Sequence, residues 1–431
     1  MPTTRSKRKR LLNSPLGAMS RTLITQPSDS NGYWEVKTMK GSHPPFNDWF
    51  RHYTDLEGQK SYLYGGVEVD VETSPSCDFH VCDLKTMNWT NITDSLTFRQ
   101  PYNPFSSINR EQKYTKLPAL LEPACTIMKL EGGTYFLIFG GYDAEKECTT
   151  SELIAVDLDS LEWFYIPVSG GSVANRTSAE IIAIRNHLFV FGGRKEPNNR
   201  APPYASYSVI EYNPNVGTWS WELCDQPFPF SRTAHPLGYN IVATAIYAGK
   251  KILLTPGQIS DARIDFSSNV IVLFHTENRT FHVASETIGD FPKNVLWYHA
   301  ISLEHIPSFG RVKTPSSSAQ IRSLGRNRGF EAAYSASLGP IDSPTPSVLL
   351  CAWVPHGEDE AAIELWQYFL PPEERIVCFK YCQKTYDLDE DFRSCVLIGS
   401  QLHLLGSRPA KAGDKSVWNI HVALPLVKNT I

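Results

Sequence analysis

Cysteine and histidine are the residues of this chain best suited to metal or nucleophilic chemistry, so their spacing decides which sites are available. The 431 residues include nine cysteines and twelve histidines. Three residues separate Cys378 from Cys382, and four separate Cys77 from Cys82. Neither pair has a second pair of ligands nearby, which a structural zinc site needs. Three histidines lie within apolar runs, where we expect core or edge residues: His187, His403 and His421. The sequence therefore predicts no catalytic residue, no metal and no cofactor.

Charge divides the chain into a basic start and an acidic remainder. Residues 1–28 hold six Lys and Arg residues and no acid, a charge of +6. The whole chain carries −4, so the residues from Asp29 onward carry −10. This acidic body argues against nucleic-acid binding over the fold. The run KRKR (Lys7–Arg10) fits a nuclear-import patch and equally a solvating tail.

Composition also bears on location. No stretch approaches the ~18 apolar residues that cross a bilayer, and the first residues are too polar for an export signal. Nine scattered cysteines, an odd number, are typical of reduced thiols. We expect a cytoplasmic and/or nuclear protein with no membrane partner.

Two stretches are nearly the same: YFLIFGG (Tyr135–Gly141) and HLFVFGG (His187–Gly193). Each is an apolar run that would be covered on both faces of a strand, followed by a glycine pair where the backbone bends or takes a positive φ. A third copy is SYLYGG. The paired glycines are Gly65, Gly66, Gly140, Gly141, Gly192 and Gly193. Because strands, not helices, follow them, these glycines do not predict phosphate loops.

A second apolar run follows each glycine pair and leads through a turn to a tryptophan. The tryptophan comes seven positions after an apolar residue, and the residue after that apolar one is Asp or Asn, which favours a turn. The pairs are Cys82 with Trp89, Val156 with Trp163, and Tyr212 with Trp219, with a weaker copy at Phe274 and Phe281. Each unit therefore holds a strand, a tight turn and a new strand.

A third feature repeats with the same phase. Arg176 and Arg232 are 56 residues apart, as are Trp163 and Trp219, and each Arg opens the next apolar run. The unit is strand, strand, Gly-Gly, loop, strand, turn and Trp strand, which makes four strands. Repeats of this length with four strands are typical of a β-propeller, in which each sheet buries its faces against its neighbours.

The glycine pair, the Trp strand and the Arg before the first strand together resemble the kelch repeat. The resemblance covers residues 61–93, 135–168 and 176–223, is weaker over 232–285 and fades afterwards. It implies an all-β, kelch-type propeller. It also implies that Trp89, Trp163 and Trp219 pack in and between blades, and that Arg176 and Arg232 bond backbone carbonyls between blades.

Counting by tryptophans predicts six blades over residues 31–426, with seven blades as the alternative. The last blade lacks a strand, and GYWEVKTM, with Trp34, precedes the first blade. We expect this N-terminal strand to pair with SVWNIHVALP in the C-terminal blade, closing the ring and removing exposed sheet edges. Residues 1–30 are predicted to be a disordered basic tail, and 307–347, rich in Ser, Pro and Gly, a disordered insertion in blade five.

The residues after the glycine pairs should open loops on one face of the propeller. Arg and Tyr dominate binding hot spots, and propellers place function on loops. We therefore predict partner-binding residues at Tyr142, Arg194, Arg200 and Tyr204. The alternative is an ordinary solvated rim, since nearby acids make the face mixed in sign.

The sequence thus favours a non-enzymatic, monomeric interaction module or scaffold that binds a protein partner on its loop face. The alternative is a small-molecule-binding or catalytic propeller, of the oxidase or sugar-mutarotase type found among kelch-like proteins. The iron motif E-x₃-D-x₃-H of nitrile-specifier-like propellers does not occur.

Overall fold

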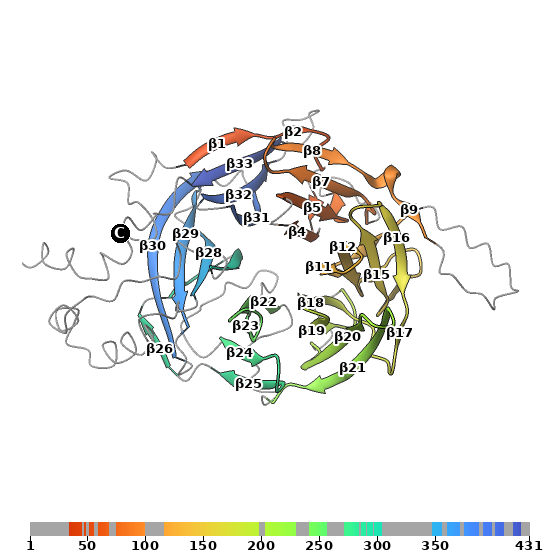
Figure 1. Cartoon of the computed structure of the whole chain (residues 1–431). Helices are drawn as coiled ribbons and strands as arrows, with labels where there is room; N and C mark the ends of the chain where they lie inside the picture. The colour runs from red at the N-terminus through yellow and green to blue at the C-terminus, as the bar shows by residue number, and fades with distance from the viewer. Residues whose placement is uncertain are drawn as a thin grey trace, which may run out of the picture. The chain divides into compact units, whose positions relative to one another are not determined.

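The computed structural model confirms a nearly all-β chain (Figure 1). The described residues run from 34 to 423, with gaps at 45–46, 49–50, 56–58, 69–74, 100–115, 198–202, 230–240, 257–270, 284–285, 290, 296, 304–346, 356–359, 371–374, 388–390, 399–400 and 409–416. Within these ranges one short 3₁₀ turn, η2 (Thr93–Ser95), accompanies the strands and no α-helix occurs. The several antiparallel sheets are consistent with a β-propeller.

The chain divides into two compact units. Unit 1 comprises Met1–Lys37, Thr244–Gly406 and Ile420–Ile431, and unit 2 comprises Thr38–Ala243 and Ser407–Asn419. Each unit is described by itself. The predicted tail and nearly all of the predicted insertion, as well as Arg200 and Arg232, lie outside the described residues.

Unit 2 holds three sheets built on the same plan, with four main strands in sequence order. The first contains β4 (Arg51–Asp55), β5 (Lys60–Tyr64), β7 (Phe79–Asp83) and β8 (Asn88–Asn91). The second contains β11 (Ala124–Leu130), β12 (Gly133–Phe139), β15 (Leu153–Asp157) and β16 (Glu162–Ile166). The third contains β18 (Thr177–Ile184), β19 (His187–Arg194), β20 (Ser206–Asn213) and β21 (Thr218–Pro227). First strands of consecutive sheets lie side by side, β4 with β11 and β11 with β18 (Figure 1).

Short parallel strands link one sheet of unit 2 to the next. β9 (Thr97–Phe98) follows the first sheet and pairs with β16 of the second, and β17 (Val168–Ser169) follows the second and pairs with β21 of the third. β2 (Lys40–Gly41) pairs with β8 in the same way. Each sheet thus receives a fifth strand on its outer edge, which covers part of an edge that would otherwise be unpaired.

Unit 1 holds most of the remaining strands. One sheet contains β22 (Ile241–Ile246), which begins at the unit boundary, β23 (Lys251–Pro256), β24 (Val272–His275) and β25 (Thr280–Val283). The next contains β27 (Trp297–Ser302), β28 (Ser347–Pro355), β29 (Glu360–Phe369) and β30 (Arg375–Asp387), with β26 (Glu286–Gly289) parallel to β30. The last has the order β1-β33-β32-β31, from β31 (Asp391–Ile398), β32 (Gln401–Arg408), β33 (Val417–Ala423) and β1 (Trp34–Thr38).

The repeated aromatic pairs lie opposite each other across the last hairpin of each sheet. The register places Cys82 opposite Trp89, Val156 opposite Trp163, Tyr212 opposite Trp219 and Phe274 opposite Phe281. Two residues before each of these four aromatics, the backbone takes a positive φ, at Met87, Leu161, Gly217 and Arg279. Local turn geometry therefore sets the seven-residue spacing seen in the sequence.

Apolar clusters fill the space between successive sheets of unit 2. Trp163, fully buried, packs with Phe136 and with Tyr64 and Phe79 of the preceding sheet. Trp219 and Trp221 pack with Leu137 and Phe139 of the second sheet. A sheet covered on both faces explains why its strands are apolar on both faces.

Two histidines with lowered pKa values make stability depend on pH: His80, buried in unit 2, and His299, half-buried in unit 1. His80 in β7 is 2% exposed, with no hydrogen-bond partner at Nδ1 among the described residues. Burial lowers the pKa of His80 to about 4, and burial likewise lowers the pKa of His299 in β27 to about 4. Because the folded chain holds each imidazole neutral, this stability is present above pH 6.5 and is lost as the pH falls toward 4.

We expect His80→Leu to reduce the acid sensitivity of folding. Between pH 7.5 and pH 5, the lowered pKa of His80 should cost the native chain about 2 kcal/mol of unfolding free energy. Urea unfolding at both pH values, for the native chain and for the variant, measures the difference. Equal losses in the two proteins would contradict the assignment to His80.

Candidate interaction face

Each of the three glycine pairs opens a loop that a backbone hydrogen bond closes at its base. In every case the carbonyl of the second glycine accepts from an N–H near the end of the loop. The pairs are Ser76 N–H to Gly66 (2.9 Å), Thr150 N–H to Gly141 (2.9 Å) and Tyr204 N–H to Gly193 (2.8 Å). We call the described residues of the three loops the loop face of unit 2: 66–68 with 75–76, 141–150, and 193–197 with 203–204. All three leave their sheets between the second and third main strands.

Glycine is needed where the middle loop, 141–150, leaves its sheet, because the next sheet approaches closely there. Gly140 has φ +65°, and a Cβ there would lie 2.5 Å from the carbonyl oxygen of Arg176. The N–H of Gly141 donates to that oxygen over 2.8 Å. The Gly140–Gly141 pair of the second sheet and the Arg176 segment of the third therefore contact each other directly.

The middle loop, 141–150, is closed internally by hydrogen bonds to a buried carboxylate. It contains a hairpin of β13 (Tyr142–Asp143) and β14 (Cys148–Thr149), with β10 (Leu120–Leu121) paired to β13. Asp143 is 4% exposed and accepts from the N–H groups of Glu145 (3.1 Å) and Lys146 (3.2 Å).

The Lys146 ammonium lies 2.9 Å from the Asp143 carboxylate, and this hydrogen bond raises the pKa of Lys146. The loop tip, from Glu145 to Cys148, is exposed to solvent. An ordered loop with an exposed tip loses little conformational entropy when a partner binds.

Arg194, predicted on the loop rim, is instead buried at the end of β19. Its guanidinium contacts both carboxylate oxygens of Glu122 (2.7 and 2.9 Å), and its Nε donates to Ser178 Oγ (3.1 Å). The Ser178 hydroxyl also donates to Glu122. The side chains of Arg194 and Glu122 are 6% and 12% exposed. Arg194 therefore ties the third sheet to the segment that begins the second.

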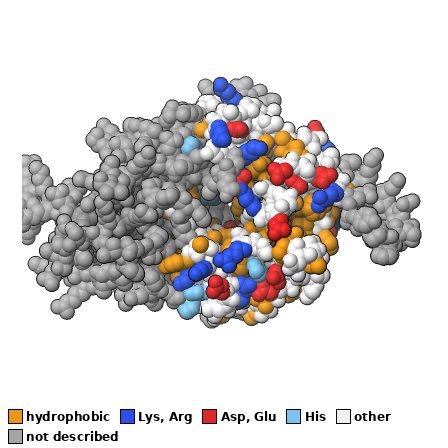
Figure 2. Space-filling view, in the orientation of Figure 1, with side chains coloured by type: hydrophobic (Ala, Val, Ile, Leu, Met, Phe, Trp, Pro, Cys, Tyr) orange, Lys and Arg blue, Asp and Glu red, His pale blue; other side chains and the backbone are white. Residues whose placement is uncertain are grey.

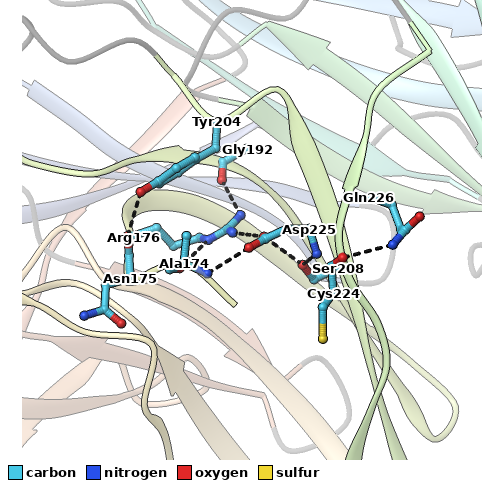
Figure 3. A network of polar contacts seen from close by, with 9 residues as sticks. All are labelled: Ala174, Asn175, Arg176, Gly192, Tyr204, Ser208, Cys224, Asp225 and Gln226. Atoms are coloured by element: carbon cyan, nitrogen blue, oxygen red, sulfur yellow. Dashed lines mark hydrogen bonds and ion pairs between the residues drawn. The ribbon is translucent and has the colours of Figure 1, made fainter. Parts of the chain in front are cut away.

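Arg176 lies fully buried at the centre of a second polar network (Figure 3). It donates to the carbonyls of Ala174 (3.1 Å) and Gly192 (3.0 Å) and forms an ion pair with Asp225. Asp225 also accepts from the N–H of Ala174 (2.8 Å). The network holds the segment before β18 against β21.

Tyr204 covers this network from the loop face. The Arg176 guanidinium lies over the Tyr204 ring, 4.8 Å from its centroid, and the Tyr204 hydroxyl donates to the carbonyl of Asn175 (3.3 Å) (Figure 3). Burial raises the pKa of Tyr204, and the positive charge of Arg176 acts in the opposite direction. Tyr204 is half-buried, so part of its ring faces solvent.

The four predicted contact residues therefore differ in their surroundings. Tyr142 is half-buried and pairs with Leu121, next to the Glu122 that holds Arg194. The ring of Tyr204 packs against the Arg176 guanidinium instead, and Arg200 lies outside the described residues. A partner-binding role for the four stays a prediction. Sequence reasoning missed Glu122 and Asp225, because neither recurs at a fixed position of the repeat.

Charge is mixed on the described part of the face that Figure 2 shows. Figure 2 shows Lys and Arg side chains interspersed with Asp and Glu, without a large area of one sign. Among the described residues, no three His, Cys, Asp or Glu side chains are grouped to hold a metal ion. A search of the same residues finds no helix that is long and apolar enough to cross a membrane.

No family model matches the chain. Kelch domain-containing protein 3 of Homo sapiens is 22% identical over 235 residues, and that of Rattus norvegicus is 28% identical over 235 residues. Each alignment covers 44% of this chain and 61% of the relative. The N-(sulfonatooxy)prop-2-enimidothioate sulfolyase of Thlaspi arvense is 24% identical over 205 residues, 47% of this chain and 49% of the enzyme.

The chain thus spans less than two thirds of the length of these curated relatives. They support a kelch-type resemblance without pointing to one member. A chain in the cryo-EM structure of RAG in complex with one melted and one unmelted RSS aligns over 90% of this chain and 99% of its own length. Its identity is 13% and its TM-score 0.45, too low to carry an argument.

Proposed function

We propose that this chain is a six-bladed, kelch-type propeller that acts as a non-enzymatic interaction module and binds a protein partner on its loop face. The observation that carries the proposal is the geometry that the three loops share: an equivalent backbone hydrogen bond to the second glycine closes the base of each loop. Binding loops on a rigid scaffold are how such folds present function.

The sheet order supports six blades. Six sheets have four main strands each, and the described strands outside them have two to four residues, too short for a seventh blade. The last sheet takes β1 from near the start of the chain as its outer strand beside β33. This pairing is what closure of the ring from both ends requires.

The chemistry of the loop face supports a protein partner. The middle loop exposes Glu145, Lys146 and Glu147. Tyr142 at the start of that loop and Tyr204 at the end of the 193–204 loop are partly exposed. Aromatic rings surrounded by charges of both signs suit a protein surface, whose rim is polar and whose contact centre is rich in Tyr and Arg. The kelch domain named in the similar proteins accords with such a role.

A photo-crosslinking amino acid at Glu147 tests the proposal. Glu147 lies at the exposed tip of the middle loop. The matched control places the same amino acid at Asn215, which is also exposed but lies in the turn between β20 and β21, at the other end of the strands. We expect irradiation in the cells of origin to capture one protein through position 147 and not through position 215, as measured by mass spectrometry.

A double variant removes two side chains of the loop face and leaves the buried ion pairs unchanged. Lys195 is an exposed residue of the 193–204 loop. Tyr142→Ala combined with Lys195→Ala should abolish capture by position 147. Capture that is unchanged by these substitutions, or equal at the two positions, would count against the loop face. Monomeric state and a cytoplasmic and/or nuclear location belong to the same proposal, and light scattering and imaging of the tagged chain test them.

A small-molecule or catalytic role is the second candidate, because one similar protein carries an enzyme name. It predicts that purified chain retains a metabolite or metal. Native mass spectrometry of the purified chain tests this prediction. A spectrum with no bound metabolite or metal would exclude the second candidate and would not bear on the first.

A further inference from the structure

The middle loop holds its one basic side chain against a buried acid. All residues of 141–150 are described, and Lys146 is the only Lys or Arg among them. Its ammonium lies 2.9 Å from the carboxylate of Asp143, whose side chain is 5% exposed, and 3.9 Å from that of Glu152. The Asp143 carboxylate also accepts two N–H groups of the loop tip. The charge of Lys146 therefore offsets the charge of Asp143 within the loop.

Two acids of the same tip lack such compensation. Glu145 and Glu147 flank Lys146 and are exposed, and neither forms an ion pair with another described residue. With one base and three acids, residues 141–150 carry a net charge of −2. Arg194 of the third loop does not offset this charge, because it is 6% exposed and paired with Glu122. The middle loop therefore presents a negative tip to solvent.

The backbone at the tip makes Glu147 an unexpected residue there. Its φ is +51°, in the left-handed region, where a side chain adds strain that glycine avoids. Residues that keep such strain are found most often at functional sites. Tyr142, half-buried at the start of the same loop, adds an aromatic ring, whose face attracts cations. Both features suit a positively charged binding partner.

We propose that the partner contacts the middle loop through a basic segment, whose Lys or Arg side chains pair with Glu145 and Glu147. The inference rests on the proposed function, in which a protein binds the loop face, and it adds the charge of the partner's contact segment. Carboxylates accept charge-assisted hydrogen bonds from Arg and Lys, whereas an acidic or phosphorylated segment would be repelled. Ion pairs on an exposed rim speed association and weaken with salt.

A photo-crosslinking amino acid at Cys148, exposed beside the tip, tests the partner's charge without replacing either glutamate. The full chain is irradiated in the cells of origin, and mass spectrometry sequences the partner peptide attached at position 148. We expect this peptide to carry more Lys and Arg than Asp and Glu. Glu145→Gln combined with Glu147→Gln should lower its yield several-fold and leave the thermal midpoint of the chain unchanged.

The matched control is Glu131→Gln combined with Glu211→Gln. It changes the charge by the same amount at two exposed residues of unit 2 that lie away from the loop face, and it should leave the yield unchanged. A synthetic copy of the captured peptide should bind the native chain several-fold more weakly at high salt than at low salt. The same peptide should show a smaller salt dependence with the variant at Glu145 and Glu147.

Three outcomes would overturn the inference alone, while position 147 still captures a protein and the proposed function stands. The first is a captured peptide with an excess of Asp and Glu. The second is a yield that the two double variants lower equally or leave equally unchanged. The third is a link to the chain's own basic residues 1–28, because the basic segment would then not belong to a partner. Failure to capture any protein at either position would contradict both proposals.

Discussion

Replacement of Glu122 by leucine should lower the free energy of unfolding by about 3–5 kcal/mol, because it leaves a buried guanidinium without its partner. Arg194 and Glu122 are joined by two contacts of 2.7 and 2.9 Å, and both side chains are largely shielded from water. Ser178 supplies an oxygen to Arg194, but it carries no charge. Urea unfolding followed by tryptophan fluorescence measures the loss.

The double variant Glu122→Leu with Arg194→Met should recover most of that loss, since an apolar pair of similar volume often equals a buried ion pair in stability. The matched control is the ion pair of Arg99 with Glu162, whose side chains are 46% and 39% exposed. Removing Glu162 should cost at most about 1 kcal/mol. If the two single variants cost the same, burial does not govern the Arg194 pair.

Gly140→Ala should cost at least about 3 kcal/mol, since it adds a backbone clash to an unfavourable φ. The added methyl would lie 2.5 Å from the Arg176 carbonyl oxygen, which is backbone and belongs to the next sheet. Relief of the clash requires separating the second and third sheets, which also weakens the 2.8 Å hydrogen bond from Gly141. Thermal unfolding measures the change.

Gly217→Ala provides the control for conformation alone. Gly217 has φ +67° in the turn between β20 and β21, and an added Cβ would meet nothing within 4 Å. It should therefore cost only about 1 kcal/mol, the price of a left-handed alanine. Equal losses at the two glycines would show that the neck contact contributes nothing beyond φ.

The repeat was readable from sequence because its causes are local. A hairpin places Val156 opposite Trp163 through a turn of a few residues, and the same spacing recurs at Tyr212 and Trp219. Runs such as FLIF predict a strand buried on both faces, and glycine pairs predict a positive φ that other residues rarely adopt. The all-β class and the four main strands of each sheet of unit 2 follow from these short-range patterns.

The candidate site depends instead on contacts between distant residues. Arg194 follows a glycine pair, where the repeat predicts an exposed loop, yet its partner Glu122 lies 72 positions earlier. Arg176 similarly meets Asp225, 49 positions later.

The sequence by itself determined the recurring strands, hairpin turns and glycine pairs, because each sheet of unit 2 needs the same strands and turns. Only the tertiary structure decided that Arg176 and Arg194 are buried and that Asp225 and Glu122 neutralise them. That outcome depends on how one sheet packs on the next, and no local spacing encodes the acid that a neighbouring sheet will supply.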